Sequence, residues 1–217
     1  MRVAVAGAAG RMGQTTIGAI EAARDLEFAG GADPELGVAV TDVLDADVLV
    51  DFSLGPHVVG NAKTATEAGV HVIIGATGWD EAELRSAVAG ARANVFAAPN
   101  FAIGAVLMMR FAAEASKLMA SAEIIEYHHA TKLDAPSGTA ARTAALMEGE
   151  VPIHSVRLPG IVADQDVILG DTAQTLTIRH VTTDRTSFMP GVLLAIRRVA
   201  ELPESPLIGL ERLLWPS

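Results

Sequence analysis

The segment 126–140, EYHHATKLDAPSGTA, carries three proton carriers and a Ser-Gly-Thr turn within a few residues. His128 and His129 are adjacent, and on a strand they would point to opposite faces, so we expect them to have different roles. Lys132 follows closely enough to join the same site. Ser137 is typical of a helix N-cap, and the N–H groups and hydroxyls of Gly138 and Thr139 can bind a carboxylate there. Proton donors beside an anion site favour a small acidic substrate.

A glycine-rich turn near the N-terminus indicates a dinucleotide site. Gly7, Gly10 and Gly13 separate an apolar run at 2–6 from a helical pattern. Glycines there let a pyrophosphate approach the helix N-terminus, although such turns also occur for packing alone. Asp33 ends the second predicted strand, where a carboxylate can accept hydrogen bonds from a ribose diol and would repel a 2′-phosphate. Arg11 could instead pair with that phosphate, so we expect NADH to be favoured and NADPH to be permitted.

The elements that must position these residues change in pattern along the chain. Strands alternate with helices up to about residue 101, which predicts a parallel sheet covered on both faces. After a long helix at 104–119 comes an alternating strand at 122–130, then a helix that starts at Ser137. Three further strands between 151 and 181 are predicted to be antiparallel. Phe52, Thr77, Asn100 and Phe101 follow parallel strands, at the sheet edge where such folds bind ligands.

Composition and charge limit the class of protein. Half of the 217 residues are apolar, and the net charge of −10 argues against nucleic acid or an anionic membrane as partner. The chain has no cysteine, which excludes disulfides, thiolate metal sites and a cysteine nucleophile. Adjacent histidines without a second ligand cluster are weak evidence for a metal, so we expect none. The apolar runs are too short for a spanning helix or a signal peptide, and we expect a cytoplasmic protein.

The chain resembles the 4-hydroxy-tetrahydrodipicolinate reductase family, also called dihydrodipicolinate reductase. EYHHATKLDAPSGTA is similar to the family signature, and GAAGRMG, VDFS, GATGW, APNFAIGAVLMM and TLTIRHVTTDRTSFMPGVLLAIR follow in the family's order and spacing. The resemblance covers nearly the whole chain. It implies an α/β protein with a Rossmann-like parallel-sheet cofactor domain, at 1–101 with 187–217. It also implies an α+β substrate-binding and tetramerisation domain with a mainly antiparallel sheet, at 102–186.

The resemblance also implies an activity and an assembly. Family members reduce 4-hydroxy-tetrahydrodipicolinate to tetrahydrodipicolinate with NADH or NADPH and loss of water, in diaminopimelate and lysine biosynthesis. The substrate is a small dicarboxylate, and the two domains are expected to close around it. Family members form homotetramers through the antiparallel sheet.

Roles follow by motif position. His128 would be the acid–base residue and Lys132 the proton donor. Substrate contacts would come from His129, Ser137, Gly138, Thr139 and Thr77. The cofactor would be lined by Gly7, Ala8, Ala9, Gly10, Arg11, Met12, Asp33, Phe52, Gly75, Ala76, Thr77, Ala98, Pro99, Asn100 and Phe101.

Two departures from the family pattern stand out. Ala76 replaces a usual threonine in the GATG motif, for which we expect a modest effect, because Thr77 keeps its hydroxyl. The connection at 149–151 is much shorter than in many family members, which could alter substrate closure or assembly.

Two other functions remain open from the residues alone. One is a different NAD(P) dehydrogenase acting on an amino-acid-like substrate, although aspartate-semialdehyde dehydrogenase chemistry is excluded because it needs a thiolate. The other is a catalytically silent dinucleotide sensor, which would not need His128, Lys132 and Thr139 together.

Overall fold

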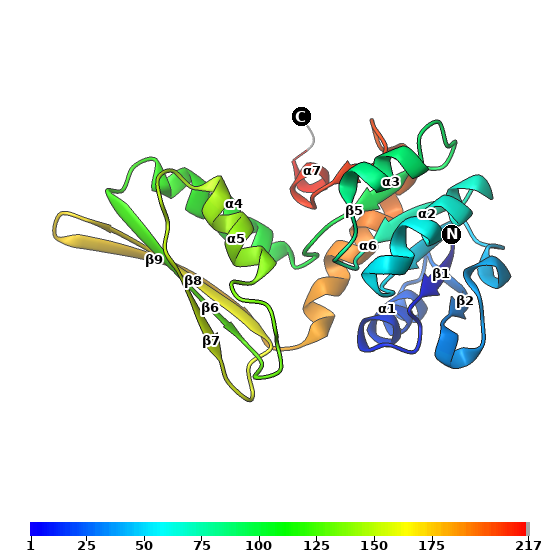
Figure 1. The fold of residues 1–217 in the computed structure, drawn as a ribbon, viewed down its shortest axis with the longest axis horizontal. Coiled ribbons are helices and arrows are strands. Elements are labelled where there is room, and N and C mark those ends of the chain that lie inside the picture. The colour runs from blue at the N-terminus through cyan, green and yellow to red at the C-terminus, as the bar shows by residue number, and fades with distance from the viewer. Residues whose placement is uncertain (216–217) are drawn as a thin grey trace. The chain divides into compact units, whose positions relative to one another are not determined.

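The computed structural model describes residues 1–215, which form two compact units. The first unit comprises Met1–Phe101 together with the chain from Phe188 onward, and the second comprises Ala102–Ser187. In Figure 1 the first unit is blue to cyan-green and orange to red, and the second is green to yellow. No helix of the described residues is both long and apolar enough to cross a membrane.

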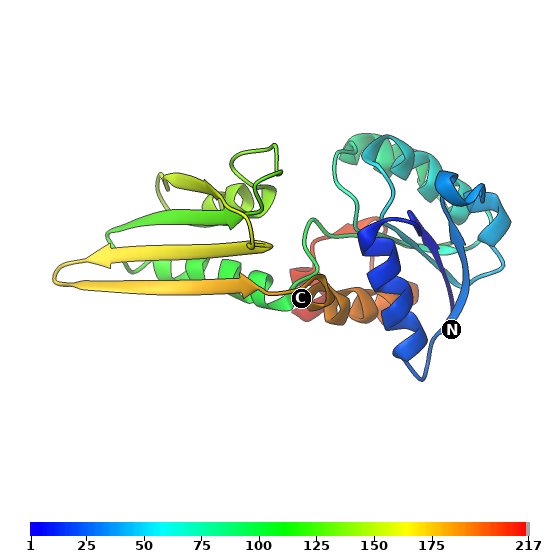
Figure 2. The same cartoon turned by 90° about the horizontal axis from the view of Figure 1, so that it is seen from below.

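The first unit is built on a six-stranded parallel sheet in the order β10-β5-β4-β3-β1-β2. Helices α1 and α6 lie on one face and α2 and α3 on the other (Figure 2). The strands are β1 (Arg2–Ala6), β2 (Glu27–Ala32), β3 (Val48–Asp51), β4 (His71–Ile74), β5 (Val95–Ala97) and β10 (Leu207–Ile208). The helices are α1 (Arg11–Ala22), α2 (Gly55–Glu67), α3 (Glu81–Ala87), α6 (Met189–Arg198) and α7 (Glu211–Leu214). Short 3₁₀ turns are η1 (Pro34–Leu36), η2 (Val40–Val43), η3 (Arg185–Phe188) and η4 (Val199–Glu201).

The central strands of this sheet are apolar because they are covered on both faces. Every residue of β3 is buried, as are all but the first residues of β1 and β4. Such strands read as continuous apolar runs instead of alternating ones. The predicted parallel, doubly covered sheet is therefore confirmed.

The second unit has a mixed four-stranded sheet in the order β7-β6-β8-β9. Its strands are β6 (Ser121–His128), β7 (Ile153–Arg157), β8 (Ala163–Asp171) and β9 (Gln174–Thr182). Helices α4 (Ile103–Ser116) and α5 (Gly138–Leu146) pack on one face of this sheet. Strand β8 runs antiparallel to both β6 and β9, so the sheet is mainly antiparallel, as predicted.

The prediction of three successive antiparallel strands is wrong for the first of them. β7 does not pair with β8 but runs parallel to β6, with His128 beside Arg157 in the register. The reason is α5, which carries the chain back along the sheet so that the next strand enters in the same direction as β6. A strand–helix–strand connection within one sheet gives a parallel pair.

Alternation along β6 places two polar side chains on the helix-covered face. Ile124 and Glu126 are fully buried, and His128 is partly buried. Ile125 and Tyr127 point to the opposite face, as the period of two requires. Glu126 and His128 therefore lie on the side from which α5 approaches.

Candidate active site

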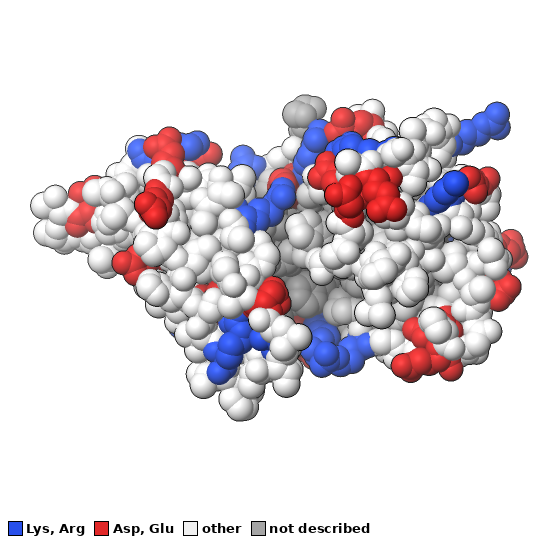
Figure 3. Space-filling model, viewed as in Figure 1, with Lys and Arg blue, Asp and Glu red and all other residues white. Residues whose placement is uncertain are grey.

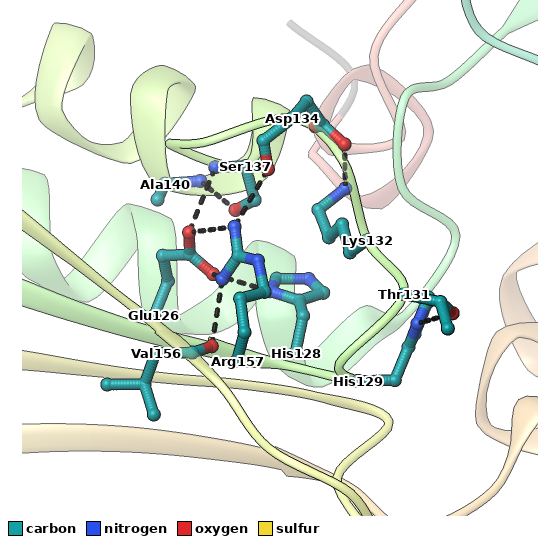
Figure 4. A network of polar contacts seen from close by, with 10 residues as sticks. All are labelled: Glu126, His128, His129, Thr131, Lys132, Asp134, Ser137, Ala140, Val156 and Arg157. Carbon is teal, nitrogen blue, oxygen red and sulfur yellow. Dashed lines mark hydrogen bonds and ion pairs between the residues drawn. The ribbon is translucent and has the colours of Figure 1, made fainter.

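The centre of the polar cluster in the second unit is Glu126, a buried carboxylate that makes four hydrogen bonds with three residues (Figure 4). Its side chain has 0% exposure. Arg157 donates to both oxygens at 2.8 Å, and the Ser137 backbone N–H donates to Oε1 at 3.3 Å. The His128 Nδ1 lies 2.5 Å from Oε2. A buried carboxylate is tolerable only when it is paired and hydrogen-bonded in this way.

These partners determine the ionisation of Glu126. Burial by itself would raise the pKa of the carboxyl, but hydrogen bonds from Arg157, Ser155 and His128 outweigh it and lower the pKa to about 2. Glu126 is therefore a carboxylate at any physiological pH.

His128 ends β6 with a side chain that is 14% exposed. Burial lowers its pKa from the ordinary value, with smaller opposing effects from the neighbouring Glu126 carboxylate. The nearby positive charges of Lys132 and Arg157 lower it further. The imidazole is therefore predominantly neutral near neutral pH, with one nitrogen available to accept a proton.

The segment after β6 turns away from the sheet and carries Lys132. Its Nζ donates to Asp134 Oδ1 at 2.8 Å, and this hydrogen bond lowers the pKa of Asp134. His129 does not share the environment of His128, since its Nδ1 lies 2.8 Å from Thr131 Oγ1. Figure 4 shows Lys132 and Asp134 on one side of the His128 ring and the His129–Thr131 pair beyond it.

Ser137 is the N-cap residue of α5, as predicted. It is 2% exposed, and its hydroxyl oxygen accepts a hydrogen bond from Ala140 N–H at 3.2 Å. This is the N-cap interaction that satisfies one of the helix's first N–H groups. Because both its hydroxyl and its N–H are used within the protein, Ser137 shapes the helix start, whereas Gly138 is exposed there.

The glycine-rich turn of the first unit has the geometry of a dinucleotide loop. Gly7 has φ +74°, a left-handed conformation that favours glycine. A Cβ on Gly13 would lie 2.1 Å from the Gly7 carbonyl oxygen, so the helix start packs directly on the turn. Within the described chain, α1 has no side-chain N-cap and no acidic residue in its first turn. Its N-terminus therefore suits a phosphate.

Asp33 follows β2 and is tied to this turn. Its Oδ2 accepts from Ala9 N–H at 3.1 Å, and Oδ1 accepts from Glu35 N–H at 2.9 Å. A pocket of about 170 Å³ opens here. It is lined by Gly7, Asp33, Val38, Val40, Ser53, His57 and neighbouring residues. Apolar walls with one carboxylate and a glycine turn fit the nucleoside part of a dinucleotide.

A second polar network supports the loop after β3. Asp51 is fully buried, and its oxygens accept from Ser53 N–H at 2.7 Å and from Asn61 Nδ2 at 2.9 Å. Phe52 lies between Asp51 and Ser53 in the sequence, and its ring is edge-on to the Phe101 ring, with the centroids 6.4 Å apart. A Cβ on Gly75 would meet the Phe52 ring at 2.1 Å. The predicted residues Phe52, Gly75 and Phe101 are thus neighbours in the first unit.

The predicted residues fall into the two units. His128, Lys132, Ser137, Gly138 and Thr139 lie on β6, α5 and the segment between them. Gly7–Met12, Asp33 and Phe52 follow β1, β2 and β3, while 75–77 and 98–101 follow β4 and β5. Among the predicted cofactor residues, Ala8, Ala98 and Phe101 are buried.

Two residues that the sequence analysis did not single out are central to the site. Glu126 could have been identified from the sequence, because a carboxylate two residues before His128 on a strand must lie on the same face as the histidine. Arg157 could not have been identified in this way, because its place beside His128 depends on the parallel pairing of β6 with β7.

Charged groups elsewhere are dispersed. Among the described residues, no group of three or more histidine, aspartate or glutamate side chains could hold a metal ion. On the face in Figure 3, charged side chains lie in several small groups, some of which contain both acidic and basic residues. No broad surface of one charge is visible on that face.

Comparison with known proteins identifies the family. Residues 1–101 match the family model described as dihydrodipicolinate reductase, N-terminus, and residues 104–214 match the corresponding C-terminus model. A 4-hydroxy-tetrahydrodipicolinate reductase of Mycolicibacterium smegmatis is 44% identical over 243 aligned positions, covering 99% of each chain. One of Desulfitobacterium hafniense is 40% identical over 264 positions, covering 99% of this chain and 98% of the relative. Both alignments exceed the 217 residues of this chain, so the relatives contain insertions.

Solved structures agree with this assignment. The dipicolinate-bound dihydrodipicolinate reductase of Paenisporosarcina sp. TG-14 superposes with a TM-score of 0.84 at 32% identity, covering 98% of each chain. A probable dehydrogenase of Thermotoga maritima, at 12% identity and a TM-score of 0.65, shares the fold alone. With both halves matched and two relatives at 40% and 44% identity over nearly the whole chain, the chain belongs to the dihydrodipicolinate reductase family.

Proposed function

We propose that this protein reduces 4-hydroxy-tetrahydrodipicolinate to tetrahydrodipicolinate with NADH or NADPH and loss of water, in diaminopimelate and lysine biosynthesis. Family membership supports the reaction, and one observation supports the site. A neutral, partly buried His128 lies beside the Lys132 segment and the start of α5. These groups together suit proton transfer on an anionic substrate. The dipicolinate bound by the Paenisporosarcina relative is a ligand of the same class, a small dicarboxylate.

Each residue of this cluster has a role in the proposal. His128 transfers a proton as the acid–base residue. Lys132, released from Asp134 by a substrate carboxylate, donates a proton or stabilises the negative charge that develops on the substrate. The backbone N–H groups of Gly138 and Thr139 hold one substrate carboxylate at the positive end of the α5 dipole. His129 and Thr77 contribute further substrate contacts, while Ser137 holds the helix start in shape.

Bound NAD(P)H would supply the hydride. The Gly7–Met12 turn would hold its pyrophosphate, and the pocket beside Asp33 its adenosine. Phe52, 75–77 and 98–101 would line the remainder of the cofactor.

The first experiment measures NADH and NADPH oxidation with substrate generated in situ from pyruvate and aspartate semialdehyde by the preceding synthase. Wild-type turnover should fall by roughly 10²- to 10⁴-fold in His128→Gln and strongly in Lys132→Ala. Cofactor binding, followed by nicotinamide fluorescence, should stay unchanged in both variants. No wild-type turnover despite tight cofactor binding would refute the proposed reaction and favour a sensor.

We propose further that NADH is preferred over NADPH. Asp33 supports this, because its carboxylate accepts from Ala9 N–H in the glycine turn, and beside a bound adenosine ribose it would repel a 2′-phosphate. Arg11 is exposed and could still permit NADPH. Asp33→Asn should raise the NADPH-to-NADH ratio of kcat/KM, and an unchanged ratio would contradict this role.

We also propose a homotetramer assembled through the second sheet. Its face opposite α4 and α5 carries Val181, which is 49% exposed, and Tyr127, whose hydroxyl donates to Asp166 at 3.1 Å. Arg179 lies over the Tyr127 ring at 5.9 Å. Sedimentation should give a tetramer for the wild type and smaller species for Val181→Arg. A monomeric wild type would overturn the proposal.

A further inference from the structure

We propose that Glu126 and Arg157 form a positioning pair for the acid–base chemistry. The Glu126 carboxylate keeps the proton of neutral His128 on Nδ1, which leaves Nε2 as the acid–base atom. The Arg157 guanidinium anchors the 129–137 segment that carries Lys132. The catalytic consequence rests on the proposed function, whereas the proton position and the anchoring can be tested without it.

The proton position follows from the contact between Glu126 and His128. Oε2 lies 2.5 Å from Nδ1, a distance that requires a hydrogen between the two atoms. An ionised carboxylate only accepts, so that hydrogen must belong to Nδ1. A neutral imidazole has one N–H, and therefore Nε2 carries the lone pair. The same carboxylate stabilises the imidazolium that forms when Nε2 takes up a proton.

The ionisation of Glu126 is secured by Arg157. Its guanidinium meets the carboxylate in a bidentate arrangement, with Nη1 on Oε2 and Nη2 on Oε1, both at 2.8 Å. The Ser137 N–H adds a further donor to Oε1. Every donor around this buried group favours the charged form, so it cannot readily take the His128 proton.

Arg157 also fastens the segment between β6 and α5. Its Nη2 donates to the Asp134 carbonyl oxygen at 2.8 Å, and Nη1 donates to the Val156 carbonyl oxygen at 2.8 Å. Asp134 in turn holds Lys132. Figure 4 shows the guanidinium between the Glu126 carboxylate and this segment. One side chain thus links β7 to both the carboxylate and the Lys132 segment.

A lysine could not replace this arginine fully. Four acceptor contacts in two directions need the planar fork of a guanidinium, whereas an ammonium has three donors on one atom. The charged groups that face His128 are Glu126 from its own strand, Arg157 from β7, and Lys132 and Asp134 from the following segment. Glu126 is the only one of these four in hydrogen-bond contact with the ring in the described structure.

The first test is the tautomer of His128 in the wild type. Long-range ¹H–¹⁵N NMR, assigned with a His128→Asn variant, should show a protonated Nδ1 and an unprotonated Nε2 near neutral pH. An Nε2–H tautomer would overturn the proposal. The tautomer is measured on the wild-type protein, without substrate or cofactor.

The second test uses Glu126→Gln. Both carboxylate oxygens accept from Arg157, but Oε1 also accepts from the Ser137 backbone N–H, which can only donate. The His128 ring can change its tautomer instead, so the amide oxygen should occupy the Oε1 position and the amide NH₂ should face His128. Nδ1 must then accept, and the tautomer should switch to Nε2–H. We expect kcat to fall by at least about 100-fold, as for other imidazoles held in the wrong tautomer, with KM little changed. The pKa of His128 in the kcat/KM profile should move to lower pH, because a neutral amide no longer stabilises the imidazolium.

A matched control is Glu114→Gln, which removes an exposed carboxylate 3.1 Å from Lys117 in the same unit. It should change neither the tautomer nor the pH profile. If Glu126→Gln leaves both as in the wild type, the proposal is refuted even if stability is lost.

The third test separates anchoring from tautomer control. Arg157→Lys keeps a cation beside Glu126, so the Nδ1–H tautomer of His128 should persist. The variant loses the hydrogen bond to the Asp134 carbonyl oxygen, so backbone amide hydrogen exchange across 131–134 should become faster. Unchanged exchange would overturn the anchoring role. Absence of wild-type turnover would overturn the proposed function, and the tautomer and exchange results would still decide this inference.

Discussion

The low pKa of Glu126 predicts how the stability of the second unit depends on pH. The pKa of its carboxyl is about 2 in the folded protein, against an ordinary glutamate value of 4.5. A group whose pKa is lowered by folding stabilises the folded state above its unfolded pKa, and this contribution is lost as pH falls through the folded pKa. The window therefore runs from pH 4.5 down to about pH 2.

The magnitude follows from this difference. The unfolded and folded pKa values differ by roughly 2.5, and at about 1.36 kcal/mol per pH unit this difference corresponds to about 3 kcal/mol at pH 7. At pH 3 roughly half of it remains, because the unfolded group is then mostly protonated. Glu126→Gln removes the titrating group, so the variant should be less stable by about 3 kcal/mol at pH 7 and by about half of that at pH 3.

The assay is equilibrium urea unfolding at pH 7, 4 and 3. Tyr127 is the single tyrosine and lies on β6, so its ring signal in NMR reports on the second unit. Glu114→Gln, which removes an exposed carboxylate, should show a small difference of under about 1 kcal/mol. A stability difference between wild type and Glu126→Gln that stays constant from pH 7 to pH 3 would refute the assigned ionisation.

Three further predictions concern the frame of the site. Gly13→Ala should lower the melting temperature and weaken NADH binding, because the new Cβ would lie 2.1 Å from the Gly7 carbonyl oxygen. The control is Gly18→Ala in the same helix. It has open space around it, so this variant should have an equal or slightly higher melting temperature. Ser137→Ala should cost about 1 kcal/mol in urea unfolding because α5 loses its N-cap, and an unchanged midpoint would mean that the cap is dispensable. Asn61→Ala should cost roughly 1–3 kcal/mol, since buried Asp51 loses a donor; equal stability of variant and wild type would contradict that network.

Features that depend on residues close together in the sequence were predictable from the sequence. The parallel α/β unit followed from apolar runs alternating with helical patterns, and α5 was expected to begin at Ser137 because of its capping chemistry. The glycine turn was recognisable because only glycine readily takes the backbone conformation found at Gly7. The sequence also indicates His128 and Lys132, because their proton chemistry is a property of the side chains themselves.

Some short elements escaped this reasoning. β10 has two residues, and α3 and α7 have seven and four, too few for a periodic pattern to stand out. β10 exists because β5 offers it an edge to pair with, through contacts more than a hundred residues apart in sequence.

The arrangement around Glu126 depends on the tertiary structure in the same way. Residue types and spacing were enough to nominate His128, but its tautomer depends on a carboxylate kept ionised by Arg157. Arg157 reaches that carboxylate only because α5 returns the chain so that β7 runs parallel to β6. Strand pairing is a long-range choice made by packing and hydrogen bonding across the sheet, and no local pattern in the chain records it.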